Sequence, residues 1–452
     1  MKRIVNTLDK LSSGKRACAV FVLCATTAIA LPAQTFTTLY SFDGSPGIYP
    51  YGGLVQTTNG DLYGTTSGGS TNTGGTVFKI TPAGTLTTLY NFCSQGMPCT
   101  DGDFPYGTLV QAINGDLYGT TLTGGANCDT GTVFKMTPSG KLTTLYSFCA
   151  QSGCTDGTNP YTGLVQATNG DFYGTTSGGG NDCGSASCGT VFKITPSGTL
   201  TTLYSFCAQS GCTDGANPYG GLVQATNGDL YGTTNAGGNG ACSVAGCGTI
   251  FKITPSGTLT TLHSFDGTDG QWPYAGLVQA TNGDFYGTTS PSYGGATGYG
   301  TIFKMTPTGT LTTLHRFCSQ VGCADGYFTY AALVQATDGD LYGTTDDGGA
   351  GVNTPYCIGC GTIFKITPTG TLTTLYNFCS QSGCPGGYYP YSALVQATNG
   401  DFYGTTYEDG GHGLQPVRRS RPLRENPDHL RHGRSGRQDS GQRSDRRDQR
   451  HL

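Results

Sequence analysis

The feature that most constrains this chain is a repeat that recurs seven times along its 452 residues. Each unit contains a Gly-Asp turn, then Leu or Phe, then Tyr-Gly-Thr-Thr. The turn aspartates follow one another at 55, 55, 58, 55, 56 and 61 residues: Asp61, Asp116, Asp171, Asp229, Asp284, Asp340 and Asp401. A fixed period in this range predicts a solenoid, a propeller or an array, because one unit cannot bury its own apolar face.

One repeat reads as four short strands. Residues 54–56 lead into the hairpin turn Asn59-Gly60, and residues 62–66 return from it. After a glycine-rich loop, residues 76–81 and 86–92 form two further strands around a Pro-Ala-Gly turn. β-Branched and aromatic residues dominate all four segments, and turn residues separate them.

Four antiparallel strands per unit are typical of a propeller blade. The sequence therefore predicts an all-β fold, a seven-bladed β-propeller of four-stranded antiparallel blades. Residues 36–42 have the sequence of a fourth strand with no blade before them, and the last repeat lacks a recognisable fourth strand. We therefore expect the N-terminal strand to close the ring, which would remove the exposed edges of an open array.

Residues 1–30 have the pattern of a signal peptide. Basic residues precede an apolar run, Ala17 to Ala30, that is too short to span a bilayer comfortably and ends in small residues. No other segment is apolar enough to cross a membrane, so we expect a secreted or cell-surface protein. The propeller should cover residues 36–413, followed by a basic tail over residues 414–452.

The tail begins where the repeat breaks. The last repeat is regular through Thr406, but the expected Gly-Thr-Val-Phe-Lys-Ile-Thr is replaced by an arginine-rich stretch without aromatic residues. Read one nucleotide later, residues 424–427 can encode Lys followed by Ile or Thr, which favours a frameshift. The alternative is a genuine disordered tail.

Between the signal peptide and the tail, charge is scarce and mostly negative. This region holds 8 of the 24 basic residues and 22 of the 28 acidic ones. A body of this sign repels phosphate backbones, so nucleic acid is not an expected partner.

These motifs also resemble a known family. The runs Gly-Leu-Val-Gln-Ala-Thr-Asn-Gly-Asp-Leu-Tyr-Gly-Thr-Thr and Gly-Thr-Val-Phe-Lys-Ile-Thr-Pro-Ser-Gly-Thr-Leu-Thr-Thr-Leu-Tyr-Ser-Phe are similar to the GloVer-type tandem repeat of exported bacterial proteins. The resemblance covers about residues 36–413. It implies a secreted or surface-anchored repeat protein and implies no catalytic residues.

Sixteen of the 17 cysteines after the signal fall in close pairs, which predicts disulfides in an exported protein. The expected pairs are Cys93/Cys99, Cys149/Cys154, Cys183/Cys188, Cys207/Cys212, Cys242/Cys247, Cys318/Cys323, Cys357/Cys360 and Cys379/Cys384. Cys128 is left over. Metal binding is the rival interpretation, but these loops carry no nearby histidines, so no metal site is expected.

An aromatic cluster is the best candidate for ligand binding. A tyrosine precedes every first strand: Tyr51, Tyr106, Tyr161, Tyr219, Tyr274, Tyr330 and Tyr391. These seven are expected to pack between blades, because a residue common to all repeats usually serves the repeat. The candidate ligand-binding residues lie two positions before these tyrosines: Trp272, Tyr49, Phe104, Phe328 and Tyr389. In the other two repeats this position holds Asn159 and Asn217. Aromatic faces suit sugar rings.

No catalytic triad, phosphate loop or metal motif is present in the sequence, and we expect no cofactor. The loop carboxylates Asp101, Asp103, Asp129, Asp182, Asp346 and Asp347 are candidates for a glycosidase-type pair or a calcium site, with solvated charge as the simpler explanation. We therefore expect a binding module for extracellular polysaccharide or surface proteins, not an enzyme. The alternatives are a secreted glycan-active hydrolase or lyase and a purely structural surface protein.

Overall fold

The computed structural model describes residues 35–408, apart from residues 43, 45, 70–73, 95, 128, 182–187, 241, 243–244, 291–297, 351–358, 382–383 and 385. The chain divides into two compact units, Met1–Gly411 and His412–Leu452, and all described residues lie in the first. The predicted signal peptide and basic tail lie outside the described residues. In the described part, no helix has the length and apolarity needed to span a membrane.

The described residues form six four-stranded antiparallel sheets and one two-stranded sheet. The first three sheets are β1 (Val55–Gln56), β2 (Leu62–Thr66), β3 (Thr76–Ile80) and β4 (Leu86–Asn91); β5 (Val110–Gln111), β6 (Leu117–Thr121), β7 (Thr132–Met136) and β8 (Leu142–Ser147); and β9 (Val165–Gln166), β10 (Phe172–Thr176), β11 (Thr190–Ile194) and β12 (Leu200–Ser205).

The next three sheets are β13 (Val223–Gln224), β14 (Leu230–Thr234), β15 (Thr249–Ile253) and β16 (Leu259–Ser264); β17 (Val278–Gln279), β18 (Phe285–Thr289), β19 (Thr301–Met305) and β20 (Leu311–Arg316); and β21 (Val334–Gln335), β22 (Leu341–Thr345), β23 (Thr362–Ile366) and β24 (Leu372–Asn377). The two-stranded sheet is β25 (Val395–Gln396) and β26 (Phe402–Tyr403), and three short 3-10 helices lie in loops: η1 (Ser152–Cys154), η2 (Ser210–Cys212) and η3 (Val321–Cys323).

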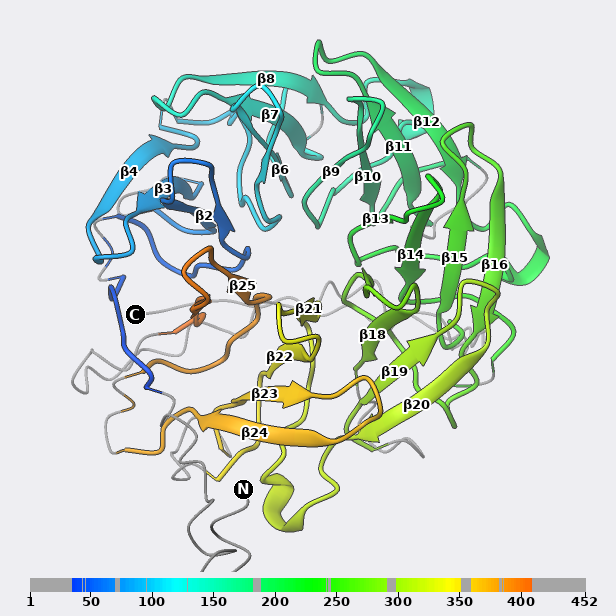
Figure 1. Cartoon of the computed structure of the whole chain (residues 1–452). Helices are drawn as coiled ribbons and strands as arrows, with labels where there is room; N and C mark the ends of the chain where they lie inside the picture. The colour runs from blue at the N-terminus through cyan, green and yellow to red at the C-terminus, as the bar shows by residue number, and fades with distance from the viewer. Residues whose placement is uncertain are drawn as a thin grey trace, which may run out of the picture. The chain divides into compact units, whose positions relative to one another are not determined.

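The sheets follow one another around a ring (Figure 1). Each strand pairs with the next one along the chain, as tight turns require, and a β-bulge interrupts the pairing of third and fourth strands in all six complete sheets. The predicted four-stranded antiparallel blade is therefore confirmed, and Asn-Gly and Pro-x-Gly turns account for it.

Apolar side chains are buried between neighbouring blades. In one such core, Tyr63 and Phe92 of the first blade meet Leu117 and Phe134 of the second. Every residue of the second strand is buried in the six complete blades, because neighbouring blades cover both faces of the sheet. The repeat thus gains its core from its neighbours, as the period predicts.

The predicted number of blades is wrong. Among the described residues there are six four-stranded blades, and the seventh repeat contributes β25 and β26. A third strand needs the sequence Thr-Val-Phe-Lys-Ile, and the chain after residue 408 does not contain it. The seventh repeat has the turn and first two strands but no sequence for the other two.

The prediction that the N-terminal strand closes the ring is also wrong. Residues 35–42 form no strand, and in the part of the chain that the structure describes the seventh repeat has no third strand beside which they could lie. The ring instead closes through the two-stranded sheet: the Thr398 amide donates to Gln56 Oε1 at 2.8 Å. The same bond joins each earlier repeat to the next, as from Thr58 to Gln111 at 3.0 Å.

A buried aspartate anchors the loops between blades. The carboxylate of Asp156, which is fully buried, accepts from the Tyr146 hydroxyl at 2.8 Å and from the amides of Ala150 and Gln151 at 2.9 and 3.2 Å. Asp101 and Asp214 accept equivalent bonds from tyrosines. Beside Asp325 a histidine takes the place of this tyrosine, with His315 Nε2 3.0 Å from Asp325 Oδ2. This histidine therefore helps to hold the loop.

We expect Asp156→Asn to lower the free energy of unfolding by about 2–3 kcal/mol, because a buried charged acceptor of three hydrogen bonds is lost. Asp171→Asn is the matched control, since Asp171 lies in a partly exposed turn with Lys193 Nζ 3.8 Å away; its cost should stay below about 1 kcal/mol. Urea unfolding of the two variants measures the difference. Equal costs would contradict the anchoring role.

Candidate functional site

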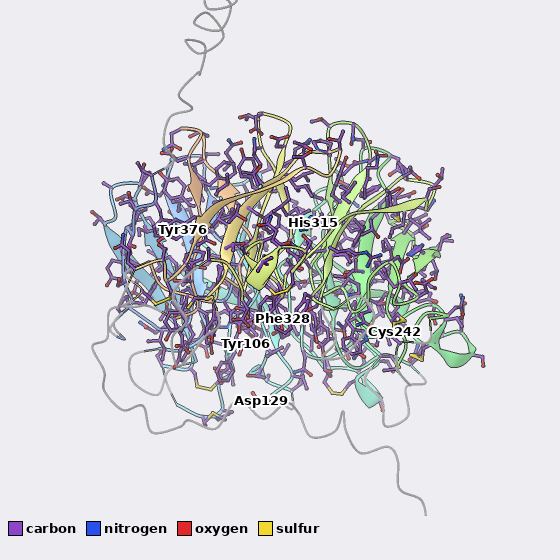
Figure 2. All side chains as sticks on the ribbon, turned by 90° about the horizontal axis from the view of Figure 1, so that it is seen from below. Tyr106, Asp129, Cys242, His315, Phe328 and Tyr376 are labelled. Carbon is purple, nitrogen blue, oxygen red and sulfur yellow. A yellow bond between two sulfur atoms is a disulfide. The ribbon has the colours of Figure 1, made fainter. Side chains whose placement is uncertain are left out.

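The propeller has two unlike faces. The loops between second and third strands and those between blades lie at one face, here called the loop face, because the segment before each first strand pairs with the segment after the second strand. Bridges such as Asp103↔Thr123 and Thr158↔Gly178 hold these segments together. Asp129 and Cys242 lie toward this face in Figure 2, with Tyr106 and Phe328 nearer to it than His315 and Tyr376. The Gly-Asp and Pro-x-Gly turns make up the opposite turn face.

Disulfides staple the loop face. The structure contains Cys93–Cys99, Cys149–Cys154, Cys207–Cys212, Cys242–Cys247, Cys318–Cys323 and Cys379–Cys384. Cys188 and Cys360 are also disulfide-bonded. Their expected partners, Cys183 and Cys357, lie outside the described residues, as does Cys128. Such bonds restrict the loops locally.

Three buried sulfurs come close enough to hold a metal ion. The Sγ atoms of Cys360, Cys379 and Cys384 lie within 4.8 Å of one another. Cys379 and Cys384 are joined to each other and Cys360 is disulfide-bonded, so none of the three offers a thiolate. A metal would bind these sulfurs only after reduction.

The seven tyrosines that precede the first strands form a closed ring of aromatic contacts. Successive ring centroids lie 4.7 to 5.5 Å apart, from Tyr51 through Tyr106, Tyr161, Tyr219, Tyr274, Tyr330 and Tyr391 back to Tyr51. The Tyr161 hydroxyl donates to that of Tyr51 at 2.9 Å. Burial raises the pKa of Tyr51 well above its ordinary value. The tyrosines therefore pack against one another around the ring.

The candidate ligand-binding residues share an unusual backbone conformation. Tyr49, Phe104, Trp272, Phe328 and Tyr389 all have φ between 52 and 59°, as do Asn159 and Asn217. Their amides and carbonyls hold neighbouring repeats together: the Phe104 amide donates to Gly74 O at 2.8 Å, and its carbonyl accepts from Leu122 at 2.9 Å. Asparagine adopts this left-handed region readily, whereas aromatic residues do so at a cost.

The structure separates the five candidates. Tyr49 and Phe104, in adjacent repeats, are 39% and 40% exposed. Trp272, Phe328 and Tyr389 are only partly exposed. The indole N–H of Trp272 donates to Gly246 O at 3.1 Å, which ties the ring to the loop between β14 and β15. Tyr49 and Phe104 therefore offer the most open aromatic surface of the set.

Tyr407 lies against these exposed aromatic residues, and the sequence did not predict its role. Its ring stacks on Tyr49 at 4.7 Å and meets Tyr391 edge-on at 5.2 Å. It follows Thr405-Thr406, a position that holds Ser, Leu, Asn or Asp in the other repeats. Comparison of the repeats at this position would have found it. We call Tyr49, Phe104 and Tyr407, with Tyr51, Tyr106 and Tyr391 beside them, the aromatic platform.

Two adjacent carboxyl groups accompany the tyrosine ring. Asp346 is 7% exposed, and its Oδ1 atom is buried without a hydrogen-bond partner. Burial, and then the charge of Asp347, raises the pKa of Asp346 well above its ordinary value. Burial also raises the pKa of Asp347 to about 6. Asp347 and Asp346 in turn raise the pKa of Tyr389, after burial itself, so these groups are close together.

The other loop carboxylates are placed differently. Asp103 is partly buried, its Oδ1 has no partner, and burial raises its pKa. Asp101 accepts a hydrogen bond from the Tyr90 hydroxyl, and Asp129 accepts one from the Gly124 amide at 2.6 Å. Both carboxylates therefore help to hold their own loops. Asp182 lies outside the described residues.

The raised pKa values of Asp346 and Asp347 predict a pH effect. The folded chain holds these protons more tightly than the unfolded chain, so the two groups lower stability as the pH rises above about 4, over a window that for Asp347 ends at about 6. The variant Asp346→Asn/Asp347→Asn should gain stability over the wild type across this window and match it near pH 3.5. Thermal unfolding at several pH values measures the difference. A gain that is independent of pH would contradict the assignment.

Several solved structures resemble this chain. A gluconolactonase from Xanthomonas campestris is 14% identical and covers 69% of this chain and 86% of its own, with a TM-score of 0.40. A luciferin-regenerating enzyme is 11% identical, covering 72% and 92%, with a TM-score of 0.41. A Thermus thermophilus protein described as an oxidoreductase (glucose dehydrogenase) is 15% identical, covering 72% and 98%, with a TM-score of 0.42.

The prediction that the chain is not an enzyme is corrected: the three similar structures are named as enzymes, and their likeness assigns no activity to this chain. The prediction relied on the lack of a catalytic motif in the linear sequence. A ring of repeats brings together side chains that are far apart along the chain, such as Asp346 and Tyr391, so a motif is not needed to form a polar cluster.

Comparison with curated proteins gave no match. The sequence does match the Gloeobacter/Verrucomicrobia repeat over residues 26–244 and 184–416, which together include most of the chain. The disulfide-rich loops agree with the extracellular location expected for this kind of protein. The chain belongs to the Gloeobacter/Verrucomicrobia repeat family.

Proposed function

We propose that this protein is an exported binding module that holds a neutral polysaccharide on its loop face. The observation that carries the proposal is the aromatic platform, in which two exposed rings from adjacent repeats lie beside the tyrosine ring. Tyr49 and Phe104 remain 39% and 40% exposed although each sits in a tightly bonded loop. Exposed aromatic surface next to polar groups is typical of binding sites.

The chemistry of the platform suits sugars. The C–H face of a pyranose packs on an aromatic ring, and its hydroxyls need acceptors at the edge of that ring. Asp103 directly precedes Phe104, and its buried Oδ1 atom has no hydrogen-bond partner among the described residues. A sugar hydroxyl would donate to this carboxyl group, and the ring beside it would carry the sugar face.

Backbone strain supports the same conclusion. Phe104 has φ of 54° and Tyr49 has φ of 59°, in a region where an aromatic residue costs roughly 1–2 kcal/mol relative to glycine. Asparagine occupies this position in two repeats at lower cost. Strained residues of this kind concentrate at ligand-binding sites, where the side chain offsets the cost of its conformation.

The charge of the protein narrows the ligand class. Acidic residues outnumber basic ones by 22 to 8 between the signal peptide and the tail. This excess repels anionic polymers such as uronate-rich glycans and nucleic acids, especially at low salt. A neutral polysaccharide avoids that repulsion and meets the platform through stacking and hydroxyl contacts.

Affinity electrophoresis against a panel of neutral polysaccharides tests the proposal. We expect Phe104→Ala and Tyr49→Ala each to weaken binding to the retained glycan by roughly tenfold, because each removes a stacking ring. Ile113→Ala, at an apolar residue 90% exposed on the turn face, is the matched control and should bind as the wild type does. Equal binding by all three variants, or no retention by any glycan, would contradict the proposal.

The pair Asp346 and Asp347 favours glycan cleavage as a second candidate function. A carboxyl group held protonated by burial donates its proton to a glycosidic oxygen, and a neighbouring carboxylate stabilises the positive charge that develops on the sugar. If the module cleaves the glycan it binds, Asp346→Asn should lower turnover by at least about 100-fold while leaving retention of the glycan unchanged. A product assay on the retained glycan decides, and unchanged turnover in this variant would exclude the role.

A further inference from the structure

Cysteines from two different loops of the sixth blade lie against one another. Cys360 lies in the loop between β22 and β23, and the Cys379–Cys384 disulfide closes the loop that follows β24. The Sγ atoms of these three residues lie within 4.8 Å of one another, and all three residues are buried in one cluster. Cys360 is itself disulfide-bonded, and the sequence predicts Cys357 as its partner. The sulfur of one disulfide therefore lies beside both sulfurs of another.

The third blade carries cysteines at the same two loop positions, but its sulfurs are arranged differently. Cys188 holds the position of Cys360, and the Cys207–Cys212 bond holds that of the bond after β24. Of the cysteines that the structure describes, those around Cys360 are the one group of three whose sulfurs lie this close together. Cys207 and Cys212 are also only partly buried, whereas the sixth-blade bond joins two buried residues. Two cysteine pairs in neighbouring loops therefore do not by themselves produce the contact.

Cysteine spacing and backbone conformation distinguish the sixth blade. Two residues separate Cys357 from Cys360, whereas four separate the paired cysteines in the same loops of the third and fourth blades. Cys360 has φ of 48°, in the left-handed region, and its counterparts Cys188 and Cys247 do not have a positive φ. A shorter span gives the chain less freedom to bring two sulfurs together, so the backbone at Cys360 takes a conformation that residues other than glycine adopt at a cost. The sulfur of Cys360 is held in place by this backbone.

The loop after β24 lacks the buried aspartate that anchors its counterpart after β8. Gly386 occupies the position of Asp156, whose carboxylate accepts three hydrogen bonds within its loop. In the loop after β8 the Cys149 amide also donates to Gly157 O at 3.2 Å, and among the described residues no equivalent bond reaches Gly387. The loop closed by the sixth-blade disulfide thus lacks two of the bonds that hold its counterpart. Fewer bonds lower the cost of a small movement of its sulfurs.

We propose that Cys360, Cys379 and Cys384 form a thiol–disulfide exchange site that takes its electrons from a dithiol. The dithiol reduces the disulfide of Cys360, leaves thiols on both of its cysteines, and is itself oxidised to a disulfide. The Cys360 thiolate then attacks one sulfur of the Cys379–Cys384 bond. A bond from Cys360 to that sulfur forms and the old bond breaks. Its electron pair leaves on the other sulfur, which takes up the proton that Cys360 released.

The exchange is intramolecular, because all three sulfurs belong to one buried cluster. Attack between groups held side by side proceeds at an effective concentration far above that of a dissolved thiol. Its product is a disulfide that joins the loop between β22 and β23 to the loop after β24. These cysteines are not part of the aromatic platform, and the site does not rest on the proposed function.

Variants with a single free thiol test the site without an added reductant. Cys357→Ser frees Cys360 beside the sixth-blade bond, and Cys183→Ser, the matched control, frees Cys188 in the third blade. Both variants also carry Cys128→Ser, so that each exported chain holds one free thiol. Each folded chain is quenched with acid and unfolded in N-ethylmaleimide at a pH too low for further exchange. Peptide mapping by mass spectrometry then locates the label and the disulfides.

We expect the label to migrate in the sixth-blade variant. About half of the molecules or more should carry it on Cys379 or Cys384, with Cys360 bonded to the other, because exchange between similar bonds approaches comparable populations. In the control the label should stay on Cys188. Label confined to Cys360 would overturn the proposal, and so would equal migration in the control, which would indicate general scrambling.

Partial reduction of the wild type keeps the test decisive if Cys357→Ser does not fold. The folded chain is titrated with dithiothreitol, quenched in the same way and mapped. We expect a bond from Cys360 to Cys379 or Cys384 in the partly reduced molecules and no bond from Cys188 to the neighbouring pair. Loss of both sixth-blade disulfides without any such mixed bond would overturn the proposal.

Discussion

Each repeat in this protein buries its apolar residues only against the next repeat, so the chain must bring its last repeat against its first. Two periodic contacts do this. An amide in each Gly-Asp turn donates to the glutamine of the following first strand, including the bond from Thr398 to Gln56 that closes the circle. The seven tyrosines form the second closed set. Both sets are complete although, among the residues that the structure describes, six blades have four strands and the seventh repeat has two.

Closure of the ring explains where the candidate site lies. The residues before each first strand must turn sharply toward the centre of the ring. The left-handed backbone conformation of Tyr49 and Phe104 makes that turn. Buried aspartates such as Asp156 and the disulfides then fix the loops that follow. The scaffold therefore determines the positions of the loop-face side chains, while their identities differ from repeat to repeat. Variable side chains on a fixed frame are the usual arrangement of a binding face.

Much of this could be predicted from sequence. The four-stranded blade follows from turn residues and strand composition, because those preferences are local. The paired cysteines lie close together along the chain, so sequence spacing was enough to suggest that they bond. The blade count and the ring closure were predicted wrongly although the sequence shows that the seventh repeat lacks a third-strand segment, because without that strand residues 36–42 have no neighbour to pair with.

The site was less predictable than the fold. Tyr407 stacks on Tyr49 although 358 residues separate them, and the carboxyl groups of Asp346 and Asp347 acquire their raised pKa values from burial that sequence does not reveal. Trp272 is the single tryptophan of the chain, but its indole N–H donates to Gly246 O in the loop between β14 and β15. Composition shows which side chains the protein contains. Only the closed ring of repeats determines which of these side chains come into contact.

The most direct test of the account is a crystal structure of the protein with an oligosaccharide of the glycan that it retains. The account predicts sugar rings stacked on Tyr49 and Phe104 at the loop face, with a hydroxyl donating to the carboxyl group of Asp103. Sugar bound to the turn face or to the outer strands, with the aromatic platform left open to solvent, would contradict it.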